Sequence, residues 1–181
     1  MKEAGSVEGN ERLRLFLALE LPDDVTTALG VWRANHLERG RPVESFHVTL
    51  AFLGARPRSE LDSILSALRE SSAETPPFEL EPACYRETRS VGMLVLRDES
   101  GKATRLAIAL QRRLERLDVY RREERPWLPH VTVVRFRERP RLDPPLPALG
   151  GFAPSGAAAF LSRLRPTGAR HEALASYPFG T

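Results

Sequence analysis

Apolar and polar positions along the chain repeat with two different periods, which together predict an α+β fold. Residues 12–20 begin in alternation and end as a continuous apolar run, a pattern typical of a central strand. Apolar positions three and four apart predict helices that begin near Asp23, Ser59 and Gly101, and the last should end near Leu117. Further strands are predicted over residues 78–85, 91–96, 157–164 and 170–177.

One short pattern occurs twice, as His47-Val48-Thr49-Leu50 and as His130-Val131-Thr132-Val133. Side chains two apart on a strand share a face, so each copy presents a His and a Thr together. The alternate positions are apolar and predict a buried face: Val48, Leu50 and Phe52 in one copy, Val131 and Val133 in the other. Since Thr supplies only nine of 181 residues, two such matches among four histidines arise by accident on the order of 1–2% of the time.

Length and composition indicate one intracellular domain. We expect residues 1–181 to form a single bilobal unit, with residues 1–11 as a flexible tail. A lone Cys84 excludes a disulfide framework and a cysteine metal site. No apolar run approaches the ~18 residues that a membrane span needs, so the sequence predicts a cytoplasmic protein.

The charge is modestly basic and comes almost entirely from arginine. The chain has a formal net charge of +3, and only Lys2 and Lys102 among its 27 cations are lysines. Arginine grips phosphate with two bonds, which fits an anionic ligand without demanding one. The charged stretch 112–125 is predicted to be the solvated end of a helix and a loop, with a role in holding RNA phosphates as the alternative.

Two histidines on opposed strands can act as an acid and a base. Histidine titrates near neutrality, so one imidazole can accept a proton from water while the other donates one to a departing oxygen. The threonine hydroxyls can hold phosphoryl oxygens. A metal centre normally needs three or four ligands, and neither motif contains an acidic residue, so we expect neither a metal nor another cofactor.

The two motifs resemble the H-x-T-x signatures of the two-histidine phosphoesterases, specifically the RNA 2′,3′-cyclic phosphodiesterases, or 2′-5′ RNA ligases, of the LigT/ThpR type. The resemblance spans nearly the whole chain, from residues 14–19 to residues 177–179. It implies a bilobal α+β fold in which two antiparallel sheets line a central cleft with helices outside. It also implies hydrolysis of an RNA 2′,3′-cyclic phosphodiester to a 2′-phosphomonoester, with reversible 2′-5′ ligation as a further possibility.

The resemblance assigns roles that the nearly symmetric motifs do not. It makes His47 the proton donor and His130 the proton acceptor, with Thr49 and Thr132 as phosphate ligands. Arg135 matches a phosphate-contacting arginine, but its strand parity is opposite to that of His130, so it needs a bulge or a strand end to reach the cleft.

Three aromatic positions near the motifs or the end of the chain carry further expectations. Phe16 and Phe46 are candidates to stack on a nucleobase, and His171 stands where the family usually has Tyr.

The expected partners are RNA ends or small nucleotides that carry a 2′,3′-cyclic phosphate, bound by a monomer. The alternative is a non-catalytic RNA-binding module that retains the cleft, although binding alone does not require two titratable groups.

Overall fold

The computed structural model describes residues 11–181, so nearly all of the predicted tail 1–11 lies outside the described residues. The regular elements, in chain order, are β1 Arg12–Glu20, α1 Asp23–His36, β2 Arg41–Pro42, β3 His47–Pro57, α2 Leu61–Ala73, β4 Glu81–Glu87, β5 Val91–Arg97, α3 Lys102–Arg116, β6 His130–Arg135, β7 Gly156–Arg165 and β8 Gly168–Tyr177. Among these residues, no helix is both long and apolar enough to cross a bilayer.

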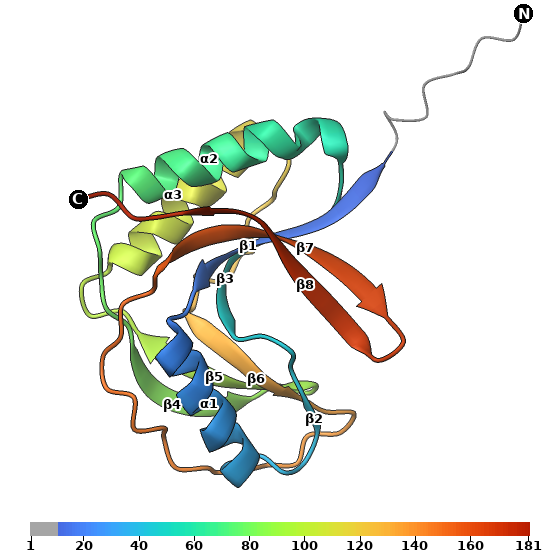
Figure 1. Cartoon of the computed structure of the whole chain (residues 1–181), viewed down its shortest axis with the longest axis vertical. Helices are drawn as coiled ribbons and strands as arrows, with labels where there is room; N and C mark the ends of the chain where they lie inside the picture. The colour runs from blue at the N-terminus through green and yellow to red at the C-terminus, as the bar shows by residue number, and fades with distance from the viewer. Residues whose placement is uncertain (1–10) are drawn as a thin grey trace, which may run out of the picture.

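The strands form one antiparallel sheet that bends through the middle of the molecule (Figure 1). Their order is β4-β5-β6-β3-β1-β7-β8, and β2 pairs with β6. The predicted α+β fold is confirmed. The two expected sheets are halves of this continuous sheet, and they are joined where β3 meets β6 through one residue pair, Val48 and Val131. We call them the β1 half (β3, β1, β7, β8) and the β5 half (β4, β5, β6, β2).

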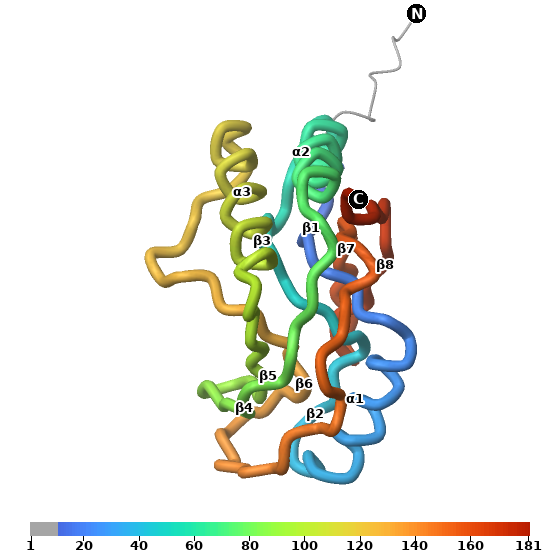
Figure 2. Tube along the Cα trace, turned by 90° about the vertical axis from the view of Figure 1, so that its left-hand side faces the viewer, coloured from blue at the N-terminus to red at the C-terminus, as the bar shows by residue number. Residues whose placement is uncertain are grey.

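Each half is covered by helices (Figure 2). Helices α2 and α3 pack on each other and on strands of the β1 half. Helix α3 buries Leu106, Leu110 and Leu114, whose spacing of four places them on one stripe. Helix α1 covers the β5 half, where the Trp32 indole lies 6.5 Å from the Tyr85 ring on β4.

Several element boundaries differ from the predictions for local reasons. A 3₁₀ turn at Arg58–Glu60 contains Ser59 and precedes α2, so the α-helix itself begins at Leu61. From the sequence, Gly54 is expected to end the strand that starts at His47, but β3 continues to Pro57, because glycine tolerates the φ of +67° that Gly54 adopts within the strand. Strand β4 begins only at Glu81, and the preceding Leu80 forms an isolated bridge with Phe152.

Candidate active site

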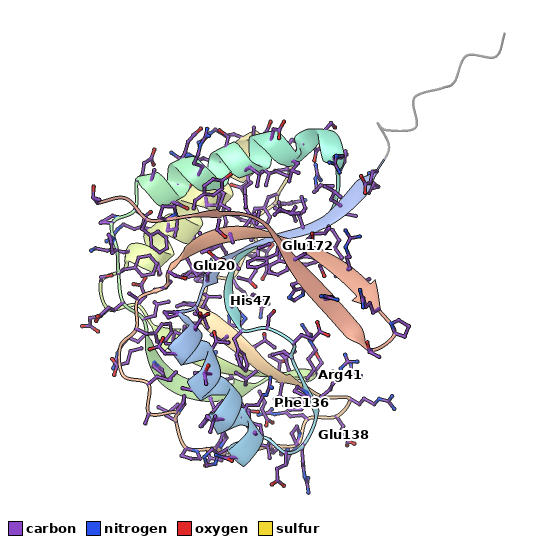
Figure 3. The ribbon with its side chains drawn as sticks, in the orientation of Figure 1. Glu20, Arg41, His47, Phe136, Glu138 and Glu172 are labelled. Atoms are coloured by element: carbon purple, nitrogen blue, oxygen red, sulfur yellow. The ribbon has the colours of Figure 1, made fainter. Side chains whose placement is uncertain are left out.

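His47 lies on β3 at the inner side of the bent sheet, surrounded by rings. Figure 3 shows it near the centre of the molecule, between the two halves. Its ring centroid is 4.8 Å from that of Phe16 and 5.4 Å from that of His171. Burial, followed by the nearby charges of His171, His130 and Arg135, lowers the pKa of His47 from 6.5 to about 4. The free protein therefore holds this imidazole neutral at pH 7.

His130 begins β6 and has a different setting. It is half-buried, and its Nδ1 lies 2.8 Å from the carbonyl oxygen of Leu128. A carbonyl only accepts, so Nδ1 carries the hydrogen and donates it. In the neutral ring the lone pair is then on Nε2. The backbone before β6 thus selects the tautomer of His130 that accepts a proton at Nε2.

The register between the two motif strands pairs each histidine with the other motif's threonine. Val48 and Val131 are partners in an antiparallel pair. Continuing that register by one residue each way places His47 across from Thr132, and Thr49 across from His130. These four side chains therefore share the inner face of the bend.

Both motif strands carry a bulge just after the threonine. Along β1 the partners skip from Thr49 to Ala51, so Leu50 is the extra residue. Along β5 they skip from Thr132 to Val134, so Val133 is the extra residue. The carbonyl of Leu50 accepts a hydrogen bond of 2.8 Å from the buried Gln111 amide of α3. A bulge reverses the alternation of side chains that follow it.

The reversal brings two side chains into the cleft at equivalent positions. Phe52 lies five residues after His47, and Arg135 lies five residues after His130; both are exposed. The predicted burial of Phe52 is wrong, because the bulge at Leu50 turns its ring outward and leaves it 49% exposed. Arg135 reaches the cleft by the kind of bulge that its strand parity required.

A cavity of about 490 Å³ unites most of the predicted site residues. His47, Thr49, Thr132 and Arg135 line it, and Phe16 contributes an edge. His130 is not part of this lining and lies beside it, across from Thr49. The structure thus brings together both threonines, Arg135 and His47 in one cleft with His130 at its margin.

The two phenylalanines expected to stack on a base have other surroundings. Phe16 is only 3% exposed, and its ring is stacked on Phe160 at 5.0 Å and lies against His47. It offers almost no surface to a base and instead supports the histidine. Phe46 has the opposite strand parity to His47, packs against the core, and has the Arg33 guanidinium over its ring at 5.0 Å. Both settings favour packing within the protein over stacking on a base.

Other cleft residues were missed from the sequence. Phe52, Arg14, Ser162 and Arg165 line the same cavity. The Arg14 guanidinium lies 4.8 Å from the centre of the Phe52 ring. The alternation along residues 12–16 could have revealed Arg14, because it places Arg14 on the same strand face as Phe16.

His171 is a third histidine of the cleft. Its Nδ1 lies 2.9 Å from the Ser45 hydroxyl, and burial is the main cause that lowers its pKa. Within residues 11–181, no cluster of three or more histidine, cysteine or acidic side chains is arranged to hold a metal ion.

Comparison with known proteins identifies the family of this chain. The family model of the 2′-5′ RNA ligase superfamily matches residues 21–172. The chain belongs to the 2′-5′ RNA ligase superfamily. It is 33% identical over 133 residues to the RNA 2′,3′-cyclic phosphodiesterase of Escherichia coli strain K12, covering 70% of this chain and 73% of that protein.

Solved structures share the fold of this protein over almost the full chain. The crystal structure of E. coli LigT in apo form matches with a TM-score of 0.83 and 25% identity, covering 95% of this chain and 100% of LigT. TT0787 of Thermus thermophilus matches with a TM-score of 0.78 and 30% identity, covering 92% and 98% of the two chains. LigT has also been crystallised with ATP and with phosphate.

Proposed function

We propose that this protein hydrolyses the 2′,3′-cyclic phosphate at RNA ends to a 2′-phosphomonoester, using His130 as the base and His47 as the acid. The observation that carries the proposal is the crossed arrangement at the centre of the bent sheet. Each histidine has the other motif's threonine across the strand pair, and Arg135 lines the same cavity. This matches the name of the E. coli relative, an RNA 2′,3′-cyclic phosphodiesterase.

His130 supplies the base because its hydrogen bond to the carbonyl of Leu128 leaves Nε2 with the lone pair. A water between Nε2 and phosphorus loses its proton to the imidazole as its oxygen bonds to phosphorus. The bond from phosphorus to the ribose O3′ breaks in the same displacement. The phosphate then remains on O2′.

His47 supplies the acid once substrate is bound. In the free protein its pKa of about 4 leaves it neutral at pH 7. A phosphodiester anion in the cleft opposes the positive charges that contribute to this low pKa, and it favours the protonated imidazole. The protonated ring then donates its proton to O3′, which departs as a hydroxyl. Substrate binding and protonation of His47 are thus coupled.

The phosphate and the nucleobase of the substrate are bound by separate groups of the protein. The Thr49 and Thr132 hydroxyls can donate to the non-bridging oxygens where negative charge accumulates, and Arg135 adds a permanent cation. Phe52 lies on β3, across the cleft from β6 with Arg135, and its exposed ring is suited to stacking on a nucleobase. The crystallisation of LigT with ATP and with phosphate supports a nucleotide-binding cleft of this kind.

We further propose that residues 1–181 form one catalytic domain, which acts as a monomer in the cytoplasm. Strands β1, β3, β6, β7 and β8 all contribute residues to the cleft, which favours a single unit. The same residues can also join a 2′,3′-cyclic phosphate end to a 5′-hydroxyl, which replaces water as the nucleophile: His130 accepts its proton, phosphorus bonds to O5′, and O3′ departs with the proton from His47. This 2′-5′ ligation requires no additional groups, and its reverse regenerates the cyclic phosphate.

Incubation of the purified protein with a 2′,3′-cyclic nucleotide in EDTA tests the proposal. We expect hydrolysis to persist, because the two histidines supply both proton transfers, and we expect the 2′-phosphate as product on chromatography. Loss of activity in EDTA with restoration by zinc or manganese would contradict the two-histidine mechanism. A 3′-phosphate product would place the leaving oxygen, and therefore the acid, differently.

A further inference from the structure

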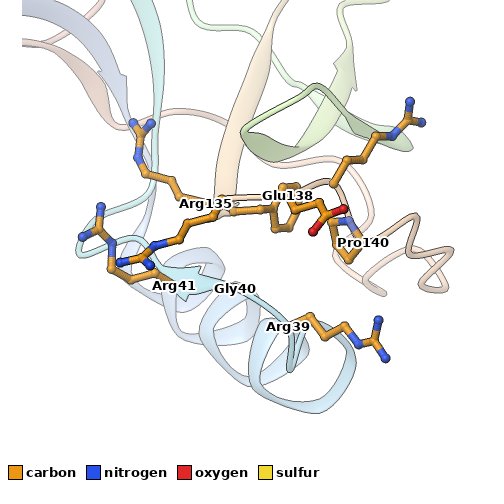
Figure 4. Close-up of a pocket in the computed structure, with 9 residues that line it drawn as sticks. Arg39, Gly40, Arg41, Arg135, Glu138 and Pro140 are labelled. Atoms are coloured by element: carbon orange, nitrogen blue, oxygen red, sulfur yellow. The ribbon is translucent and has the colours of Figure 1, made fainter.

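A second cavity adjoins the histidine cleft and is strongly basic (Figure 4). It has a volume of about 800 Å³, within the size range of clefts that bind small ligands. It lies between β2 with the turn before it and the segment that follows β6. One carboxylate, Glu138, and five arginines line it: Arg39, Arg41, Arg135, Arg137 and Arg139. We call it the arginine groove.

Most of the positive charge in the arginine groove is uncompensated. Arg39, Arg41, Arg135 and Arg137 are exposed, and none of them forms an ion pair within residues 11–181. The exception is Arg139, whose Nε lies 3.3 Å from the buried carboxylate of Glu87. Four guanidinium groups are therefore free to bind an anion.

The charged stretch 112–125, the other basic region noted in the sequence, differs from the arginine groove because several of its arginines form ion pairs. Arg113 pairs with Glu74 at 2.6 Å, Arg122 with Glu115 at 2.9 Å, and Arg125 with Glu123 at 3.5 Å. Much of its positive charge is neutralised within the stretch or by α2. The structure therefore favours the arginine groove over this stretch as a phosphate-binding surface.

The arginine groove is continuous with the histidine cleft. Arg41 and Arg135 are cross-strand partners between β2 and β6, and both line both cavities. Gly40 makes this close pairing possible: its φ is +106°, and a Cβ there would lie 2.7 Å from the carbonyl oxygen of Arg135. Figure 3 shows Arg41 and Glu138 together toward the edge of the molecule, away from His47. A chain held at His47 can thus continue outward past Arg41 and Arg135.

The chemistry of an RNA end fits this path. A 2′,3′-cyclic phosphate occupies the last ribose, so the remainder of the molecule leaves that ribose through its 5′ phosphate. Each further nucleotide adds one negative charge, and arginine binds phosphate through two parallel hydrogen bonds. We propose that the arginine groove binds the backbone phosphates that precede the cyclic end, and that the preferred substrate is an oligoribonucleotide rather than a mononucleotide. The direction of the chain rests on the function proposed above.

Binding can be measured without catalysis. Fluorescence anisotropy would follow 5′-labelled oligoribonucleotides of increasing length that end in a 3′-phosphate, which this chemistry does not hydrolyse. The test variant is Arg39→Ala/Arg137→Ala. The matched control is Arg112→Ala/Arg116→Ala, which removes two exposed charges from α3, whose residues do not line either cavity.

Wild-type affinity should rise with RNA length until the arginine groove is filled. The test variant should weaken binding of the longer RNAs by about tenfold and reduce the slope of log affinity against log salt by about 1.4, since each lost phosphate contact accounts for about 0.7. The control should retain both the affinity and the slope. Equal losses in the two variants, or no gain in wild-type affinity with length, would overturn the proposal.

The RNA-binding test of the arginine groove can be told apart from the test of the proposed hydrolysis. Hydrolysis of a cyclic mononucleotide by the wild-type protein tests the histidine cleft alone. A protein that binds long RNA through Arg39 and Arg137 but leaves the cyclic nucleotide intact would retain the arginine groove and contradict the proposed catalysis.

Discussion

On β3, His47 is enclosed by Phe16 and His171, and burial holds its pKa near 4. On β6, His130 is half-buried at the strand start and is oriented by the carbonyl oxygen of Leu128. The two strands otherwise agree closely, with the same order of buried and exposed residues and a bulge directly after each threonine. A symmetric framework thus supports asymmetric chemistry, because the neighbouring elements determine what each histidine can do.

The largest expected effect separates the two histidines by substrate. His130→Ala should lose about 10²–10⁴-fold in kcat/KM on both a 2′,3′-cyclic nucleotide and an activated nitrophenyl phosphodiester, because water needs its base in either case. His47→Ala should lose a similar factor on the cyclic nucleotide but distinctly less on the nitrophenyl diester, whose leaving group departs without a proton.

Competition between the two substrates would check that they occupy the same cleft. Rescue of His130→Ala by the activated diester, with no rescue of His47→Ala, would reverse the assignment. In that case His130 on β6 would be the acid and His47 on β3 would be the base.

The next effect concerns stability at low pH. The unfolded chain protonates His47 near pH 6.5, whereas the folded chain does so only near pH 4. Unfolding therefore takes up a proton between these values, and stability falls as the pH is lowered through this window by about 3 kcal/mol. Urea unfolding at pH 7 and pH 4 would measure this loss.

His47→Gln is the control for that measurement, since glutamine does not titrate. Carboxylates titrate in the same window in both proteins, so the relevant quantity is the difference between them. His130→Gln gives the matched comparison from β6. If His47→Gln lost as much stability as the wild type, the enclosure of His47 would have no effect on its protonation.

Smaller effects are expected at the threonines. Thr49→Val and Thr132→Val each remove one hydroxyl while keeping the shape of the side chain, and a hydrogen bond to a charged phosphate corresponds to about 10- to 100-fold in kcat/KM. Kinetics on the cyclic nucleotide would measure both variants side by side. A loss in one variant only would show that the two halves do not share the phosphate evenly.

The smallest expected effect lies in the pKa of His47 itself. His171→Phe removes one of the charges that lower this pKa, and the pKa should rise while staying below 6.5, because burial is the larger cause. An NMR titration of the His47 ring protons would follow the change. A further fall in the pKa would mean that His171 shields His47 and does not repel its charge.

The sequence was informative about the motifs and poor at the positions that follow them. Alternation correctly placed the His and Thr of each motif on one face, and the spacing of Leu106, Leu110 and Leu114 predicted α3. It failed at Phe52, because it did not foresee the bulge at Leu50, whose carbonyl accepts a hydrogen bond from Gln111 of a distant helix. Local alternation contains no information about a partner 61 residues away.

The sequence also could not predict the tautomer of His130 or the enclosure of His47. His130 depends on the path of the backbone through Leu128, and His47 depends on rings from β1, β7 and β8. The resemblance could assign the donor and the acceptor, but only the surroundings supply a physical reason for the difference.

The pairing of β1 with β7 has a consequence for how the chain is made. Strand β1 pairs on one side with β3 and on the other with β7, where Leu15 lies beside Leu161, so its second neighbour is made only when most of the chain has left the ribosome. Contacts of such long sequence separation form slowly, because a large loop must close before they stabilise anything. Nascent chains that end before β7 therefore lack the Phe160 and His171 rings beside His47, and we expect activity to arise late in synthesis and all at once.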